Sequence, residues 1–303
     1  MNFGCFPNDI TRILVYDVFA EERNKGNPAG VVLQADTMGQ KQMQRIAYEL
    51  GYNETAFVCQ SLLADYGIRF FTPGQEVPMC GHATIASVCA LYEAGYIGTG
   101  KIKIQTSEGI LEISIENVGT IRVGMQQNPY REMKFTGGKK ELAEAIGIVP
   151  DDIDDKYPIV YGSTGLWTLL VPIRSLGCFK KMNPKNSLFP SIMKENVKAS
   201  VHPFCMETYH TECQMHGRHF SSPYSGTRED PVTGTASGAM AAYYRKYIQT
   251  DSKRRSFLKI EQGQEIGKDG IVEVMVPSDL SESIKIFGTA VFVEEKKVGI
   301  IEI

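Results

Sequence analysis

Short apolar segments separated by turn residues run through the chain and predict a structure rich in strands. In the first half, apolar or alternating stretches predict strands at residues 10–20, 31–34, 53–58, 66–73, 101–107, 109–116 and 120–126. In the second half, residues 165–173 read as a strand buried on both faces. The pattern therefore indicates sheets with helices inserted between their strands.

Helical spacing appears in segments of two different kinds. Outer amphipathic helices are predicted at residues 36–50, 137–148 and 186–197, the last interrupted by Pro190. In the first of these, Asp36 or Thr37 can cap the start, and Gly51 ends the helix. The segment 83–95 is small or apolar almost all round, which predicts a helix enclosed by other elements.

The region around the enclosed helix recurs in the second half of the chain. Residues 70–87, FFTPGQEVPMCGHATIAS, resemble residues 219–240, HFSSPYSGTREDPVTGTASGAM, and both end in a helix rich in Ala and Ser. Chance similarity between two small-residue helices is the alternative. We expect two copies of one α+β domain, at residues 1–124 and 125–289, each with a sheet wrapped around a central helix. The C-terminal strand, at about 290–303, is a further candidate element of the first domain.

Net charge, the length of apolar runs and the cysteine count exclude some classes of function. The 303 residues carry a net charge of −3, so there is no basic surplus for a dedicated nucleic-acid binder. No run approaches the roughly 18 apolar residues that cross a bilayer, and no charged leader or cleavage site indicates a signal peptide. The seven cysteines are odd in number and scattered. We therefore expect reduced thiols and a cytoplasmic location.

The two enclosed helices begin with sequences that suit an anion. Gly81 opens the first helix, and Gly234 with Thr235 opens the second. Unpaired N–H groups and the helix dipole attract negative charge at such positions, and glycine lets a ligand approach the backbone. If the halves are related by a pseudo-two-fold axis, both starts would face one inter-domain cleft that suits a small carboxylate-bearing ligand. The simpler interpretation is that each glycine only fits a tight turn.

Three titratable residues lie next to these helix starts. Glu54 precedes an apolar strand, His82 follows Gly81, and Asp230 precedes Pro231. Taken singly, each has a simpler explanation: a solvated carboxylate, a histidine satisfied at a helix start and an ordinary turn residue. Only their shared position beside the proposed anion sites makes them candidates for catalysis.

The motifs GNPAGVV, NETAFV, CGHATIA, EDPVTGTASG and EQG, in this order, resemble the phenazine-biosynthesis isomerase (PhzF-like) family. That family has the wider diaminopimelate epimerase-like fold. The resemblance implies two pseudo-symmetric domains, each a curved, mostly antiparallel sheet around a central buried helix. It also implies a homodimer, and an active site in a cleft with no metal and no organic cofactor.

The resemblance assigns roles to individual residues. It implies that Glu54, His82 and Asp230 are catalytic, and that Gly81, Gly234 and Thr235 bind substrate. The implied function is a cofactor-independent isomerase in which Glu54 takes a proton from a small carboxylate substrate and returns it elsewhere. Asn53 departs from the phenazine enzyme, which has Ser there, and this difference bears on substrate preference.

Two other functions remain open. The epimerase branch uses one thiol before each helix, and here Cys80 occupies the first position but Thr233 the second. Because a hydroxyl cannot replace a thiolate as base, a symmetric two-thiol mechanism is disfavoured, and Cys80 is either a buried hydrophobe or the thiol of an epimerase or racemase. The other possibility is a non-catalytic protein that binds small acids or partners on the same fold.

The segment 202–219 holds four of the five histidines and two cysteines. A metal site and two ordinary strands are the alternatives here. The spacing matches no standard zinc pattern, which favours the strands.

Overall fold

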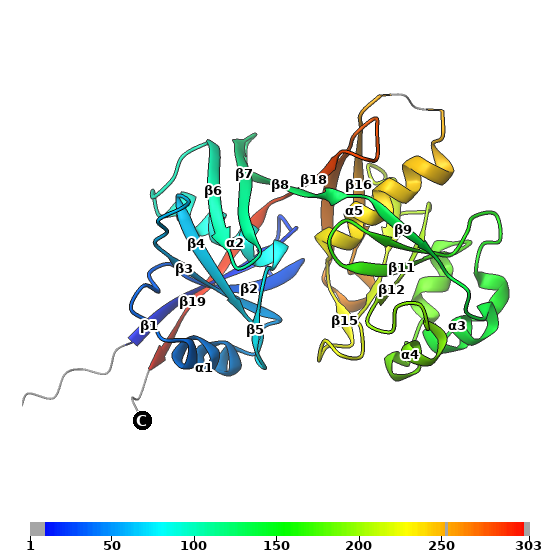
Figure 1. The fold of residues 1–303 in the computed structure, drawn as a ribbon, viewed down its shortest axis with the longest axis horizontal. Helices are drawn as coiled ribbons and strands as arrows, with labels where there is room; N and C mark the ends of the chain where they lie inside the picture. The colour runs from blue at the N-terminus through cyan, green and yellow to red at the C-terminus, as the bar shows by residue number, and fades with distance from the viewer. Residues whose placement is uncertain (1–9, 252–253, 300–303) are drawn as a thin grey trace, which may run out of the picture. The chain divides into compact units, whose positions relative to one another are not determined.

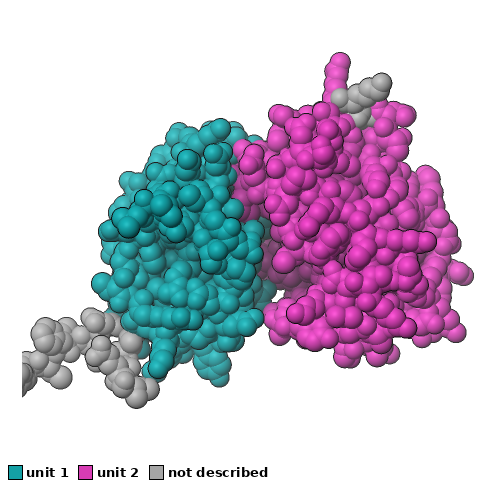
Figure 2. Space-filling model, viewed as in Figure 1, with its two compact units in different colours: residues 1–24, 28–123, 289–303 teal, residues 25–27, 124–288 magenta. Residues whose placement is uncertain are grey.

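The computed structural model describes residues 10–251 and 254–299. Within them the chain forms two compact units (Figure 2). Unit 1 comprises residues 10–24, 28–123 and 289–299, and unit 2 comprises residues 25–27 and 124–288. Residues 300–303 of the predicted C-terminal strand lie outside the described residues. In the described part of the chain, no helix is both long and apolar enough to cross a membrane.

Unit 1 is built on one mixed sheet (Figure 1). Its strands are β1 (Ile10–Val18), β2 (Asn27–Val32), β3 (Glu54–Cys59), β4 (Tyr66–Phe71), β5 (Glu76–Val77), β6 (Gly100–Thr106), β7 (Gly109–Asn117) and β19 (Ala290–Gly299). β19 pairs antiparallel with β1, so the first and the last described strands lie side by side in this sheet.

Unit 2 contains the remaining strands. They are β8 (Ile121–Pro129, which begins in unit 1), β9 (Arg131–Lys134), β10 (Val160–Ser163), β11 (Trp167–Pro172), β12 (Ser200–Cys205), β13 (Met215–Gly217), β14 (His219–Phe220), β15 (Glu229–Asp230), β16 (Ser256–Gln262), β17 (Gly270–Val276) and β18 (Ser283–Gly288). Short β14 and β15 pair with each other, which places His219 opposite Asp230.

The two sheets repeat one pairing pattern. In unit 1, β2 is parallel to β3, β3 antiparallel to β4, β4 parallel to β6 and β6 antiparallel to β7. In unit 2, β11, β12, β13, β16 and β17 follow each other with the same sequence of directions. A helix connects β4 to β6 in one unit and β13 to β16 in the other. The expected α+β fold of two similar halves is therefore confirmed.

The connecting helices α2 (Gly81–Glu93) and α5 (Gly234–Tyr243) lie at the centre of their units. Every residue from 83 to 91 in α2, and from 236 to 243 in α5, is buried. α2 packs against β1, β3 and β19, and α5 packs against β10, β11, β16, β17 and β18. Small side chains let strands approach a helix from several sides, so each sheet can wrap around its helix. α5 continues as a π-helical turn (Tyr244–Ile248).

The outer helices depart from the predictions at their ends. α1 (Gln40–Leu50) begins at Gln40, because the Asp36 carboxylate instead accepts the backbone N–H of Gln60 at 2.6 Å. Its end at Gly51 is as predicted, with a φ of 68° that favours glycine. α3 is Lys139–Ile146. Pro190 does not interrupt a helix but lies in the first turn of the short α4 (Phe189–Ile192), where a missing N–H costs nothing.

The described residues also contain four 3₁₀ turns. They are η1 (Pro150–Asp152), η2 (Leu176–Lys181), η3 (Asn186–Leu188) and η5 (Gln264–Ile266). All four lie in unit 2, where η2 and η3 are part of the connection between β11 and β12.

The histidine-rich segment forms strands, as favoured from its spacing. β12 and β13 run antiparallel within the sheet of unit 2. His202 Nδ1 lies 3.1 Å from His219 Nδ1, and His216 lies between two carboxylates. These side chains therefore contact partners inside the unit.

His216 and its two glutamates form a buried ionic cluster. Its Nδ1 lies 3.1 Å from Glu261 and its Nε2 lies 3.2 Å from Glu265, and all three side chains are at most 4% exposed. Burial opposes the charged imidazole, but the two carboxylates outweigh it and raise the pKa of His216. Backbone N–H groups of Tyr209 and His210 also donate to Glu261. The cluster thus joins β13, β16 and η5.

This cluster predicts a pH-dependent stability of unit 2. Because the pKa of His216 is raised in the folded protein, protonated His216 contributes its full stabilisation below about pH 6.5, where the histidine of the unfolded chain is also protonated. This contribution is lost as the pH rises through the pKa that His216 has in the folded protein. We expect His216→Gln to lower the free energy of unfolding by about 3–5 kcal/mol at about pH 6, and by clearly less at about pH 9. Denaturation followed by fluorescence of Trp167, the sole tryptophan, reports on this unit.

His210→Gln is the matched control, because His210 contacts Glu261 through a backbone N–H that the substitution keeps. An equal loss of stability at both pH values in His216→Gln would contradict the ionic account.

Candidate active site

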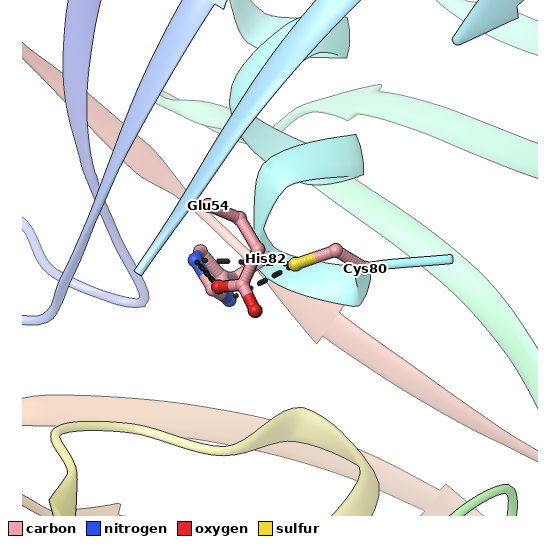
Figure 3. A group of neighbouring side chains, drawn as sticks. All are labelled: Glu54, Cys80 and His82. Atoms are coloured by element: carbon pink, nitrogen blue, oxygen red, sulfur yellow. Dashed lines mark hydrogen bonds and ion pairs between the residues drawn. The ribbon is translucent and has the colours of Figure 1, made fainter. Parts of the chain in front are cut away.

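Unit 1 brings Glu54, Cys80 and His82 together at the start of its central helix (Figure 3). Glu54 is the first residue of β3 and lies opposite Ala29 of the parallel strand β2. Cys80 is the N-cap residue of α2 and His82 its second residue. Because the sheet encloses α2, the N-terminus of this helix lies beside the first residue of β3, which carries the Glu54 carboxylate.

The contacts within this cluster are short. His82 Nε2 lies 3.4 Å from Glu54 Oε2, and the Cys80 thiol lies 3.4 Å from His82 Nδ1. The His82 side chain is 9% exposed and that of Glu54 is 23% exposed. Burial lowers the pKa of His82 to about 4, so the imidazole is neutral at neutral pH. A neutral histidine can donate one hydrogen bond and accept another.

Both central helices begin without a side-chain cap. Cys80 and Thr233, the two N-cap residues, make no capping hydrogen bond to their helices. Instead, Thr84 donates its hydroxyl to the Cys80 carbonyl at 2.7 Å, and Ser237 donates to the Thr233 carbonyl at 2.8 Å. The first N–H groups of each helix, at Gly81 and Gly234, have no acceptor within the helix and can bind a ligand or water.

Unit 2 fixes the Asp230 carboxylate with two side-chain donors. The Thr233 hydroxyl donates to its Oδ2 at 2.5 Å, and the Asn27 amide donates to its Oδ1 at 2.8 Å. The Asn27 amide also donates to the Val232 carbonyl at 3.0 Å, so both of its hydrogens are used. Gln262 donates to the Asp230 backbone carbonyl at 2.7 Å.

Asn27, Thr233 and Gln262 were not among the sequence-predicted site residues. Asn27 lies in the GNP motif and Gln262 in the EQG motif, both of which carried the family resemblance without any role. Asn27 is fully buried and Gln262 is 1% exposed. The only signal in the sequence was a polar residue inside a short motif, which does not reveal its partner; the partner of Asn27 lies some 200 residues away in sequence.

The predicted residues fall into two groups. Glu54, Gly81 and His82 belong to unit 1. Asp230, Gly234 and Thr235 belong to unit 2, where Gly234 and Thr235 are the first residues of α5. The expectation that Glu54, His82 and Asp230 converge on one ligand stays a prediction.

The cluster in unit 1 also has the composition of a metal site. One ligand atom each from Glu54, Cys80 and His82 lies within 4.8 Å of the others. Among the described residues, this is the one set of three or more such groups that lie so close together. Carboxylate, thiolate and imidazole are all ligands of Zn²⁺ in proteins.

Comparisons with known proteins agree on one family. The profile of the family described as "Phenazine biosynthesis-like protein" (PhzC-PhzF) matches residues 16–296. A Bacillus subtilis protein named "Uncharacterized isomerase YfhB" is 50% identical over 287 residues, covering 94% of this chain and 97% of its own. The Escherichia coli "Uncharacterized isomerase YddE" is 33% identical, covering 91% and 94%.

Solved structures with a similar fold include a member of the same family. The crystal structure of a Bacillus anthracis phenazine biosynthesis protein of the PhzF family has a TM-score of 0.94 at 47% identity, covering 96% of this chain and all of its own. A probable proline racemase from Agrobacterium radiobacter has a TM-score of 0.63 at 13% identity, covering 96% and 93%. The second likeness shows the fold alone.

The geometry around Asp230 predicts that Thr233 acts through its hydroxyl. Thr233→Val keeps the branched shape but removes the donor to Oδ2, and hydrogen bonds to charged groups contribute about 1.5–3 kcal/mol. We expect unit 2 to lose stability in this range, measured by denaturation with Trp167 fluorescence. Thr233→Ser retains a hydroxyl and should stay within about 0.5 kcal/mol of the parent protein. Equal losses in both variants would show that packing, and not the hydroxyl, matters at this position.

Proposed function

The chain belongs to the phenazine biosynthesis-like (PhzC-PhzF) family and has its isomerase- or epimerase-like function, and from this premise we propose that Glu54 moves a proton within a small carboxylate-bearing substrate. Glu54 abstracts a proton from a carbon made acidic by a neighbouring carboxylate or enol system, and returns it to another carbon. Neither a metal nor an organic cofactor takes part in the proposed reaction.

The approach of Glu54 to His82 is the observation that carries this proposal. A neutral imidazole 3.4 Å from the carboxylate can orient it, or can hydrogen-bond a substrate oxygen that gains charge during the reaction. Glu54 is partly exposed, so a substrate carbon can reach it. A single carboxylate serves both steps, since it becomes an acid once it has taken the proton.

The helix starts supply the proposed binding groups. N–H groups at Gly81 and Gly234, together with the Thr235 hydroxyl, would hold the substrate carboxylate, and the helix dipoles would favour its negative charge. Asp230, held by Thr233 and Asn27, would accept a hydrogen bond from a substrate hydroxyl or amino group. The proposal requires both groups of residues to act on one substrate molecule.

One observation weakens the two-thiol alternative. The Thr233 hydroxyl, at the position of the second thiol, donates to Asp230. A hydroxyl is a far weaker acid than a thiol and keeps its proton at neutral pH, so Thr233 does not supply the second base of a two-thiol mechanism. Cys80 contacts His82, so chemistry with one thiol remains the second candidate.

We also propose a homodimer in the cytoplasm. The six cysteines in the described part of the chain are all free, which suits a reducing compartment. Closed dimers are the commonest assemblies of soluble proteins.

Glu54→Gln tests the proposed base directly. The amide keeps the shape but cannot accept a proton, so we expect turnover to fall by at least ~10²- to 10⁴-fold with the fold retained. NMR of a panel of small carboxylic acids incubated with the protein in D₂O measures this turnover, as isomer formed or deuterium taken up. Glu49→Gln is the matched control, because Glu49 is a surface residue paired with Arg45 in α1.

Near-normal turnover in Glu54→Gln would reject the assignment. If the parent protein neither isomerises any of the acids nor incorporates deuterium into them, the non-catalytic binding protein is favoured instead.

Cys80→Ala separates the glutamate mechanism from the thiol mechanism. If Glu54 moves the proton, we expect turnover to fall less than ~10-fold, because the thiol takes no part in the chemistry. If Cys80 is the acid or base, turnover should fall by ~10²- to 10⁴-fold or more. The same NMR assay decides between these outcomes, with Cys89→Ala as a control for loss of a buried thiol on the same helix.

A further inference from the structure

Glu54, Cys80 and His82 offer three different ligating atoms at one helix start. We propose that this cluster is a Zn²⁺ site with an open fourth position, and that Zn²⁺ bound there inhibits the enzyme. The binding stands on the geometry alone. The inhibition rests on the proposed function of Glu54.

The distances approach those of a tetrahedral site. Zn²⁺ binds N and O at about 2.0–2.2 Å and S at about 2.3 Å, which separates neighbouring ligand atoms by about 3.3–3.7 Å. His82 Nε2 lies 3.4 Å from Glu54 Oε2 and 4.0 Å from Cys80 Sγ. Both other ligands therefore lie beside the His82 ring, with the thiol nearer to Nδ1 at 3.4 Å. A rotation of the imidazole and small movements of the other two side chains would bring all three ligands around one ion.

The ligand set selects the metal. Mg²⁺ and Ca²⁺ prefer oxygen ligands, whereas thiolate and imidazole suit Zn²⁺. Three protein ligands leave one position for water or a substrate oxygen, as in catalytic zinc sites. Binding forms Zn–S, Zn–N and Zn–O bonds, and the thiol proton passes to solvent with no change of oxidation state.

The backbone already holds two of the ligands. Cys80 and His82 are separated by one residue at the start of a helix whose next nine residues are buried. Glu54 is fixed by pairing of β3 with β2 and β4. Because these elements are packed in the core of unit 1, the ion would not have to order a loop, and this lowers the cost of binding.

Zinc at this place would prevent the proposed proton transfer. A Glu54 carboxylate that ligates Zn²⁺ is a much weaker base, because the cation stabilises its negative charge, and the ion and His82 occupy the place that the substrate would approach. Stoichiometric Zn²⁺ should therefore lower turnover at least ~10-fold, and a chelator should restore it.

Co²⁺ provides the direct probe of binding, because thiolate ligation gives a near-ultraviolet charge-transfer absorption and a tetrahedral site gives intense visible bands. We expect one Co²⁺ per chain with both features, displaced by one Zn²⁺. Cys80→Ser should lose the charge-transfer band, and Glu54→Gln should weaken Co²⁺ binding at least ~10-fold. Cys89→Ala, which removes a buried thiol from the same helix, should keep the full spectrum.

Two results would overturn the site. One is the absence of a charge-transfer band when Co²⁺ is added to the parent protein. The other is a band that persists in Cys80→Ser, which would place the metal on other residues. Circular dichroism of each variant confirms that it is folded, and Glu54→Gln serves as the second test if Cys80→Ser is not.

Turnover measures the inhibition, and the Co²⁺ spectrum measures the binding, so the two claims are tested separately. A full Co²⁺ spectrum with unchanged turnover in the Zn²⁺-loaded protein would refute inhibition. A parent protein that turns over no acid would refute the proposed function, while the spectrum would still decide whether the zinc site exists.

Discussion

A helix without a polar face has to be enclosed, and this constraint organises both units. α2 and α5 are built from small and apolar residues, and no side of either can face water without exposing apolar surface. The strands therefore wrap around them, and only the helix ends reach polar surroundings. The N–H groups of the first turn have no partner within the helix, which makes these helix starts the places where a polar ligand could bind.

The two units share one architecture but carry different side chains at the start of the central helix. In unit 1 the N-cap residue is Cys80, and its neighbours are a carboxylate and a neutral imidazole. In unit 2 the N-cap residue is Thr233, and its hydroxyl holds the Asp230 carboxylate. One unit thus carries groups able to exchange a proton, and the other carries a carboxylate fixed by donors. This asymmetry fits a reaction with a single acid–base group better than one with two equal groups.

Buried hydrogen bonds explain the polar residues of the GNP and EQG motifs. Asn27 and Gln262 are enclosed amides that donate to Asp230 and its surroundings. An apolar residue at either place would leave a buried acceptor unpaired, at a cost of about 1–3 kcal/mol. In the same unit, His216 joins Glu261 and Glu265 of β16 and η5 to β13. These buried polar contacts therefore favour the observed pairing of β13 with β16 in unit 2.

The sequence alone determined the class of fold, the two enclosed helices and the candidate residues at their starts. It could do so because periodicity, small-residue helices and glycine at a helix start are local signals. It misplaced the start of α1 and the role of Pro190, because the Asp36 partner at Gln60 and the packing of α4 depend on distant residues.

Only the tertiary structure decided that Glu54 lies against His82 and that Asn27 holds Asp230. The reason is that a side-chain contact across 203 residues is fixed by strand pairing and packing, which no local pattern records.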